Sequence, residues 1–243
     1  MKIAFISDIH GNAWALRAVL DDIKEKGIKE IYDLGDSLYG PLDPKGTYHL
    51  LADWKIESVC GNQDRIIIEN ADSPEINPTL KYVKNQLSEK AMLWLEELPA
   101  CRIVHDQIYL CHGTPANDSG YLLEQLHDNF VGIKDYNQIE ILLADVKQKI
   151  IICGHSHKPG LVETQERLII NPGSVGLPAY DDELPMPHKI ENYSPKARYC
   201  IIDLDRNLTI EHVAVSYDYE NAALAAEKNK REDWARWLRT GRA

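Results

Sequence analysis

Short apolar segments of this chain end abruptly in side chains that can bind a metal ion, and this pattern constrains the fold more than any other feature of the sequence. The first segment, residues 3–7, is followed by Asp8 and His10. A short apolar run with β-branched residues is typical of a buried strand. Ligands of open α/β sheets bind at the carboxyl ends of strands, so the pair predicts half of a metal site. Alone, Asp-x-His is a weak signal, because these residues also hydrogen-bond the backbone of turns.

The next segment predicts a strand, a helix and a second strand. Asn12 can cap a helix whose apolar residues recur at helical spacing until Gly27. Residues 29–34 then form a short apolar strand that ends in Gly-Asp, with the carboxylate of Asp36. A βαβ connection makes the two strands parallel neighbours, so we expect Asp36 at the same sheet edge as the Asp-x-His pair.

The pattern recurs along the chain. Strands are predicted at residues 57–60, 101–104, 107–111, 149–153 and 168–170. The polar side chains that follow them are Asn62, His112, His155, His157 and, in an Asn-Pro-Gly-Ser turn, Ser174. A purely structural interpretation must explain why so many strand ends carry such residues when the chain has only nine histidines.

The remaining segments complete a single domain over residues 1–243. Helices are predicted at residues 46–54, 120–128 and 137–146, within a helical insert at 65–98 that Pro74 and Pro78 interrupt, and at the C-terminus within 218–240. Residues 177–196, rich in acidic residues and proline, are predicted to be a loop that could cover the site. Residues 197–204 and 208–217 predict an antiparallel pair joined at Asp205-Arg206-Asn207.

Composition excludes several classes of protein. With 44% hydrophobic residues, no apolar run long enough to cross a bilayer and no recognisable leader, the chain is expected to be cytoplasmic. Five cysteines without a Cys-x-x-Cys pair argue against a disulfide framework or a zinc knuckle. A net charge of −11 disfavours extensive DNA or RNA binding, although a small phosphate ester could bind where cations gather locally.

The strand-end residues together form a donor set for divalent cations. The set consists of Asp8, His10, Asp36, Asn62, His112, His155 and His157. Oxygen and nitrogen donors without a thiolate suit Mn²⁺, Fe²⁺, Ni²⁺ or Zn²⁺ rather than Ca²⁺ or a cysteine-rich zinc site. The donors suffice for two ions if one carboxylate bridges them, and ions about 3.5 to 4 Å apart are typical of phosphoryl hydrolysis.

Five ordered motifs resemble those of the calcineurin-like metallophosphoesterase superfamily over residues 1 to about 215. They are Asp8-x-His10, Gly35-Asp36, Gly61-Asn62, His112-Gly113 and Gly154-His155-Ser156-His157. The flanking sequences look like the small bacterial and archaeal predicted phosphodiesterases of this superfamily. The resemblance implies an α/β (α+β) fold, a metallophosphoesterase-type β-sandwich flanked by helices, with a dinuclear metal centre. The Asp-Arg-Gly that follows Gly-Asp in protein serine/threonine phosphatases is absent, which disfavours phosphoprotein substrates.

By matching motifs, the resemblance also implies which residues hold each ion. One ion would be held by Asp8, His10, Asp36 and His157, and the other by Asp36, Asn62, His112 and His155, so that Asp36 bridges them. A hydroxide between the ions would attack phosphorus in line, without a covalent enzyme intermediate. The residues expected nearest the reaction are Asp36, Asn62, Gln63 and His112. The expected substrate contacts are Asn12, Gln63 and Ser174, although a cap role for Asn12 competes with its contact and is preferred.

One departure from the superfamily pattern affects the expected substrate. Many members carry His after Gly-Asn, where this chain has Gln63. A glutamine amide donates a hydrogen bond but cannot supply a proton, so a leaving group that needs no protonation is favoured. The hypothesis is a phosphoanhydride, such as a dinucleoside polyphosphate, or an activated ester. Asp64, His105 and Tyr39 are candidate replacement acids.

Two functions from different classes remain open at this point. The first is a two-metal hydrolase of phosphodiester or phosphoanhydride bonds in a small soluble substrate, which could be a nucleotide. The second is a binding or scaffold protein of the same fold that is a weak catalyst, an alternative that Gln63 favours and the complete donor set opposes. The oligomeric state is not indicated by the sequence.

Overall fold

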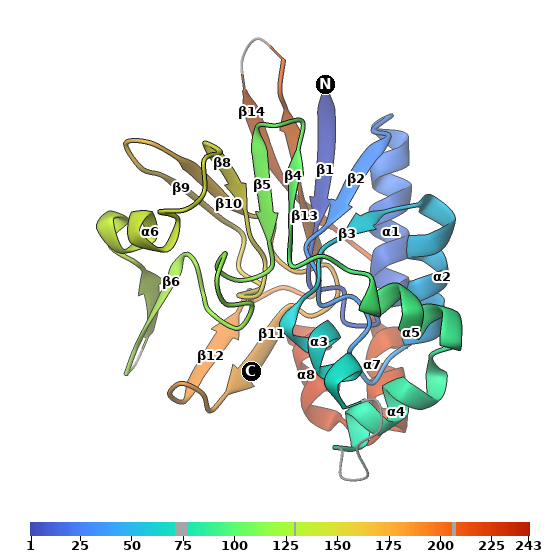
Figure 1. Ribbon diagram of the computed structural model, residues 1–243. Coiled ribbons are helices and arrows are strands. Elements are labelled where there is room, and N and C mark those ends of the chain that lie inside the picture. The colour runs from blue at the N-terminus through green and yellow to red at the C-terminus, as the bar shows by residue number, and fades with distance from the viewer. Residues whose placement is uncertain (71–76, 129, 206–207) are drawn as a thin grey trace.

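Two five-stranded sheets pack face to face, with helices on their outer surfaces (Figure 1). The structure is a computed structural model that describes residues 1–70, 77–128, 130–205 and 208–243. The first sheet has the order β14-β13-β1-β2-β3. Its strands are β1 (Lys2–Ile6), β2 (Glu30–Asp33), β3 (Glu57–Ser58), β13 (Ala197–Asp203) and β14 (Thr209–Val215). The predicted sandwich flanked by helices is therefore confirmed.

The second sheet has the order β4-β5-β8-β10-β9. Its strands are β4 (Cys101–Val104), β5 (Ile108–Cys111), β8 (Ile150–Ile152), β9 (Gly160–Glu163) and β10 (Leu168–Asn171). In each sheet three neighbouring strands run parallel, β1-β2-β3 in one and β5-β8-β10 in the other, while the remaining strands pair antiparallel. The parallel strands of both sheets end on the same side of the molecule, where the loops that follow them meet (Figure 1).

The alternation of side chains along β1 separates two hydrophobic cores. Ile3 and Phe5 face the second sheet and pack with residues such as Leu110. Ala4 and Ile6 face the helices on the outer surface of the first sheet. Because successive side chains of a strand point to opposite faces, β1 is apolar throughout, as expected of a strand buried on both sides.

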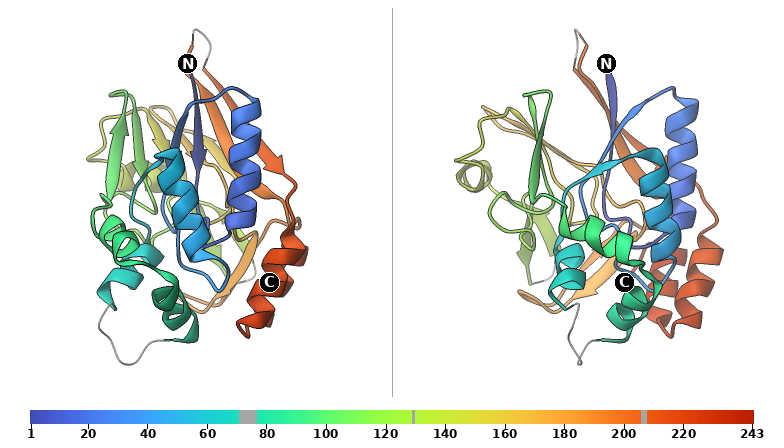
Figure 2. Two further views of the ribbon diagram at one scale, coloured as in Figure 1. Left: turned by 90° about the vertical axis from the view of Figure 1, so that its right-hand side faces the viewer. Right: turned by 45° about the vertical axis from the view of Figure 1, so that its right-hand side comes forward.

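The helices cover the outer faces of the two sheets (Figures 1 and 2). On the first sheet lie α1 (Ala13–Glu25) and α2 (Pro44–Trp54), and the predicted insert forms α3 (Asn62–Glu69), α4 (Pro78–Gln86) and α5 (Glu89–Glu96) beside them. The other sheet is covered by α6 (Tyr136–Leu142), whose Ile139 is buried there. Pro74 and part of the turn predicted at residues 205–207 fall outside the described residues. No helix of the described segments is long and apolar enough to cross a membrane.

Two predicted segments were wrong and contain strands of hairpins. Residues 120–128 contain a strand, β6 (Glu124–His127), which pairs with β7 (Phe130–Ile133), while the preceding Leu122 and Leu123 enter the core of the second sheet. Residues 177–196 form a hairpin of β11 (Ala179–Asp182) and β12 (His188–Glu191) instead of a loop. Both errors concern short strands that pair with each other in hairpins outside the two main sheets, where pairing and packing outweigh the local sequence pattern.

The C-terminal segment forms two helices instead of one. They are α7 (Tyr219–Lys228) and α8 (Glu232–Thr240). Lys230 between them adopts a positive φ of 59°, and Asn229 donates a hydrogen bond to the carbonyl of Pro41. The break lets Ala226 of α7 and Trp237 of α8 share one hydrophobic cluster. A single straight helix could not bury both faces in this way.

Asn12 links the first helix to two distant segments. Its Oδ1 accepts a hydrogen bond from the backbone N–H of Ala15, which caps α1 as predicted. Its Nδ2 donates to the carbonyl of Gly176 and to the hydroxyl of Tyr217. The side chain is fully buried, so the predicted substrate contact of Asn12 has no free atom to make it and we assign the residue to the fold.

We expect Asn12→Ala to lower the free energy of unfolding by about 2 to 3 kcal/mol, because it removes a cap and leaves buried partners without a hydrogen bond. Ser88→Ala, which removes only the cap of α5, should cost about 1 kcal/mol. Urea unfolding of the metal-free proteins measures both. Equal losses for the two variants would show that the buried amide contacts contribute nothing.

Candidate metal centre

The side chains predicted to bind metal meet where the parallel strands end. They form two groups, Asp8 with His10 and His157, and Asp36 with His112 and His155; in each group the ligand atoms lie within 4.8 Å of one another. The remaining predicted ligand, Asn62, places its Oδ1 3.0 Å from Nε2 of His112. The two groups adjoin, since Oδ1 of Asp8 lies 3.4 Å from Nε2 of His157 and 4.0 Å from Nε2 of His112.

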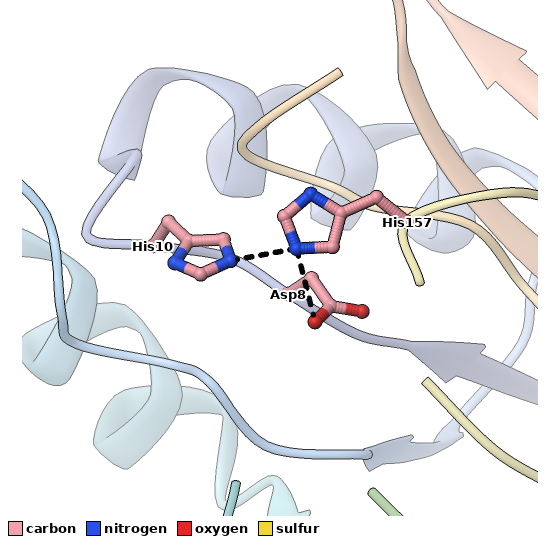
Figure 3. Close-up of side chains that lie close together, drawn as sticks. All are labelled: Asp8, His10 and His157. Atoms are coloured by element: carbon pink, nitrogen blue, oxygen red, sulfur yellow. Dashed lines mark hydrogen bonds and ion pairs between the residues drawn. The ribbon is translucent and has the colours of Figure 1, made fainter. Parts of the chain in front are cut away.

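The first group shows how tightly the donors converge. Nε2 of His10 and Nε2 of His157 are 3.0 Å apart, and the carboxylate of Asp8 lies beside them (Figure 3). Oδ2 of Asp8 accepts hydrogen bonds from the hydroxyl of Ser7 and the backbone N–H of His155. Its Oδ1 is buried and has no hydrogen-bond partner in the described structure.

The hydrogen bonds of the two imidazoles determine where their protons lie. Nδ1 of His10 lies 3.0 Å from the carbonyl oxygen of Tyr39, and Nδ1 of His157 lies 2.8 Å from that of Leu177. A carbonyl only accepts, so each Nδ1 carries a proton, and in a neutral imidazole the Nε2 then carries a lone pair. Two lone pairs and an unpaired carboxylate oxygen then face one another in a buried space. This arrangement fits a divalent cation, which would satisfy all three donors.

The second group has the same construction. Nδ1 of His112 donates to the carbonyl of Leu34 at 2.8 Å, which directs Nε2 toward Asp36, whose Oδ2 is 3.4 Å away. The backbone N–H of Gln63, at the start of α3, donates to the other oxygen of Asp36 at 2.8 Å. Histidine ligands whose second nitrogen is held by a backbone carbonyl are typical of metal sites.

The protonation of the imidazoles agrees with this assignment. Burial lowers the pKa of His10 and of His155 to about 4, so both are neutral donors at neutral pH. Burial also opposes the charged form of His112, but the carboxylate of Asp36 outweighs it and raises the pKa of His112 to about 10. Without a metal, His112 is therefore protonated at neutral pH, and the carboxylate of Asp36 balances its charge. The same carboxylate would balance the charge of a bound cation.

The backbone at the site is strained. Five of the seven donor residues have a positive φ between 52° and 67°, namely Asp8, His10, Asp36, His155 and His157. For residues with a side chain this conformation costs on the order of 1 kcal/mol or more each. Backbone hydrogen bonds between the loops maintain it, including those from Asp8 to Gly35 and from His10 to Asp36. Strain of this kind concentrates at functional sites.

Two glycines allow the loops to approach closely. A Cβ on Gly61 would lie 2.2 Å from Oδ1 of Asp36, and one on Gly154 would lie 2.0 Å from the hydroxyl of Ser7. Both distances are too short for any side chain. The Gly-Asn and Gly-His sequences are therefore required by packing as well as by the donors that follow them.

Two buried carboxyl groups support the loops. Asp64 accepts hydrogen bonds from the backbone N–H groups of Ser37 and Gly61 and so joins the loops of Asp36 and Asn62. Burial raises the pKa of Asp64 to about 8. Asp33 accepts from the hydroxyl of Ser37, and burial raises its pKa to about 7.

A cavity of about 220 Å³ lies over the donors. Gln63 lines it, as predicted, and so does Tyr39. Further wall residues, which local sequence patterns do not indicate, come from the segment before β6 (Tyr121), from the hairpin (Tyr180) and from the C-terminal segment (Arg231, Trp234 and Trp237). The helical spacing of Trp234 and Trp237 favours a packing role, and only the fold reveals that they also line the site.

Two other predicted residues take structural positions. The buried hydroxyl of Ser174 donates to the carbonyl of Asp8 and accepts from the N–H of Leu177, so it orders the loop instead of lining the cavity. His105 pairs with Glu30 at the start of β2, the end of the strand opposite Asp36. His105 is therefore too remote to act as the replacement acid.

Comparisons with known proteins agree with the geometry. Residues 1–192 match the family described as the calcineurin-like phosphoesterase superfamily domain. The chain is 29% identical to an uncharacterized protein of Methanocaldococcus jannaschii, over 96% of this chain and 94% of that protein. It has the fold of a metallophosphoesterase from Sphaerobacter thermophilus (TM-score 0.77, 23% identity, 99% of both chains). A hypothetical protein from Pyrococcus horikoshii shares that fold (TM-score 0.74, 24% identity, 99% of this chain and 98% of that one).

Addition of Mn²⁺ to the metal-free protein should stabilise its fold against thermal unfolding. A ligand at 100 times its dissociation constant contributes about 2.7 kcal/mol, which for two sites corresponds to a rise in melting temperature on the order of 10 °C. We expect Asp36→Asn to remove most of this rise, because the variant weakens both sites. Asp203→Asn, which alters a carboxylate that binds the N-terminal amine, serves as the matched control. A full rise in Asp36→Asn would contradict the proposed bridging position.

The pH dependence of stability tests the buried carboxyl of Asp33. Its pKa is near 4 in the unfolded chain and about 7 in the fold, so its contribution to stability is full below pH 4 and is lost as the pH rises through 7. As the pH rises from 5 to 8, we expect the free energy of unfolding of Asp33→Asn to increase by about 2 kcal/mol relative to that of the unsubstituted protein. Urea unfolding in the presence of a chelator measures this difference. A constant difference across this range would mean that Asp33 ionises normally.

Proposed function

Since the chain belongs to the calcineurin-like phosphoesterase superfamily, we propose that it hydrolyses phosphodiester or phosphoanhydride bonds in a small phosphorylated compound with two divalent ions in its site. The observation that carries the proposal is the pair of adjoining donor groups. An oxygen of Asp8 without a hydrogen-bond partner lies there in a buried space beside two imidazole nitrogens 3.0 Å apart, which is costly unless a cation binds them. Two bound ions would supply an activated water and neutralise charge on the phosphoryl oxygens.

The side chains around the donors hold the substrate in this proposal. Gln63 projects from the start of α3 into the cavity, where its Oε1 is buried without a partner. Rotation of the carboxamide by half a turn would present its N–H groups to a phosphoryl oxygen instead. Gln63 thus binds and orients, but it has no proton to give to a leaving group.

Among the three candidate replacement acids, Tyr39 is best placed. It lines the cavity, and burial raises its pKa, so the phenol keeps its proton at neutral pH. Asp64 is buried beneath the loops with its oxygens bound to backbone N–H groups. A phenol is a weak acid, so we expect the enzyme to favour leaving groups that depart without protonation.

This expectation favours phosphoanhydrides or activated esters over alkyl esters. A leaving phosphate has a last pKa near 6 and needs little protonation, whereas an alkoxide requires a proton. The net charge of −11 disfavours long polyanions such as nucleic acids and leaves small phosphorylated compounds as the substrate class. Gln63 still favours the alternative of a binding or scaffold protein. Hydrolysis assays distinguish that alternative from an enzyme.

Hydrolysis of bis(p-nitrophenyl) phosphate with added Mn²⁺ tests the proposal directly. We expect measurable turnover that Asp36→Asn abolishes and Asp203→Asn leaves unchanged. Absence of turnover in the metal-loaded protein would support the scaffold alternative. Turnover that survives in Asp36→Asn would mean that another site is responsible.

A series of aryl phosphodiesters measures the role of Gln63. We expect the rate to fall steeply as the pKa of the leaving phenol rises, because the site lacks a strong general acid. Gln63→His should flatten this dependence and accelerate the poorest substrates by about 100-fold, the lower range of general-acid catalysis. A shallow dependence in the unsubstituted protein would show that another group already protonates the leaving oxygen.

A further inference from the structure

Arg231 introduces a positive charge at the cavity over the donors. It is the only Lys or Arg among the described residues that line this cavity, whereas Asp181 and Asp182 line it with negative charge. It lies immediately before α8, outside residues 1–192 that match the family. The C-terminal segment therefore adds a charge that the metal-binding motifs do not account for.

The side chain of Trp234 lies between Arg231 and the metal-binding residue His10. The indole of Trp234 packs edge-on against the imidazole of His10, with 5.8 Å between ring centroids. The guanidinium carbon of Arg231 lies 5.3 Å from the centroid of the same indole. Arg231 is thus separated from His10 by a single aromatic ring and lines the same cavity.

Hydrogen bonds hold the guanidinium in place but do not occupy it fully. Nε and Nη2 donate to the carboxylate of Asp233, and Nη1 donates to the hydroxyl of Thr79. Within the described part of the chain, one N–H on each terminal nitrogen has no partner. A guanidinium fixed in this way can donate two parallel hydrogen bonds, the geometry in which arginine recognises phosphate.

Two residues that line the cavity each carry a polar atom without a partner. Oε1 of Gln63 and Nε1 of Trp237 are buried and have no hydrogen-bond partner among the described residues. Buried polar groups without a partner are rare, so each points to a molecule absent from the protein alone. Trp234 and Trp237 are themselves each 4% exposed, which leaves no open indole face for a stacked base.

We propose that Arg231 binds the phosphoryl group that leaves, so that the preferred substrates are phosphoanhydrides in which two phosphoryl groups are adjacent. This inference rests on the proposed function. In the reaction, the oxygen of water bonds to the phosphorus over the donors, and the bond from that phosphorus to the bridging oxygen breaks. The electron pair stays on the bridging oxygen, the departing phosphate is held by Arg231, and the protons of water pass to the products or the solvent.

The structure favours a phosphoanhydride over an activated ester for the same reason. An aryloxide leaving group carries a single charge on one oxygen, whereas a departing phosphate presents several charged oxygens that a guanidinium can bind together. This charge stabilisation also suits a site in which Gln63 cannot provide a proton. Arg231 is thus a residue that determines specificity, supplied by a segment beyond the metal-binding motifs.

Calorimetric titration of the Mn²⁺-loaded protein with methylenediphosphonate and with inorganic phosphate tests the inference. Methylenediphosphonate carries two adjacent phosphoryl groups joined by a bond that cannot be hydrolysed, so binding is measured without turnover. We expect Arg231→Gln to weaken diphosphonate binding tenfold or more and phosphate binding less than about threefold. Arg231→Lys should give an intermediate loss for the diphosphonate, because it keeps the charge without the planar fork.

Arg239→Gln is the matched control. Arg239 lies in α8 and pairs with Glu220 and Glu227, and it does not line the cavity. We expect this variant to bind both probes as the unsubstituted protein does. Equal weakening of both probes by Arg231→Gln, or no change in either, would overturn the inference, and Arg231→Lys decides if the glutamine variant does not fold. Failure of the unsubstituted protein to hydrolyse any ester would count against the proposed function without changing this comparison.

Discussion

The structure is organised around one constraint: the fold brings metal-binding side chains that repel one another close together, where its parallel strands end. Nε2 of His10 and Nε2 of His157 face each other at 3.0 Å, and an oxygen of Asp8 beside them has no partner. Backbone carbonyls fix the imidazole protons on the far side, so the protein cannot relieve this repulsion by changing tautomer. Left-handed backbone at these residues adds strain. Bound cations would offset both the repulsion and the backbone strain. The rest of the sandwich holds the metal-binding side chains in place.

Much of the fold and nearly all of the donor set could be predicted from the sequence. Parallel pairing brings the ends of β1 and β2 to one edge of a sheet, so local pattern and topology suffice to place Asp8 near Asp36. The histidines that complete both groups follow strands of the second sheet, and only the resemblance to the superfamily placed them at the same site. The hairpin at residues 177–196 was missed because the strands of residues 179–182 and 188–191 are stabilised mainly by each other and by distant neighbours. Likewise, no local feature distinguishes a tryptophan that only packs from Trp234, which packs and also walls the cavity.

In the proposed function, the site divides into a part that performs chemistry and a part that selects the substrate. The donors and the loops around Asp36 belong to residues 1–192, which match the superfamily. The cavity wall over them comes partly from the hairpin and from the C-terminal helices, where Arg231 and the tryptophans lie. Gln63 and Arg231 point to the same conclusion by independent routes: the first removes a proton donor, and the second provides for a charged leaving group.

The central claim is that the two donor groups hold a pair of ions bridged by Asp36. Anomalous diffraction from crystals soaked in Mn²⁺ tests it most directly, because each ion gives its own peak. The account predicts two peaks about 3.5 to 4 Å apart, one beside His10 and His157 and one beside His112 and His155, with the carboxylate of Asp36 between them. A single peak at full occupancy, or peaks away from these residues, would contradict it.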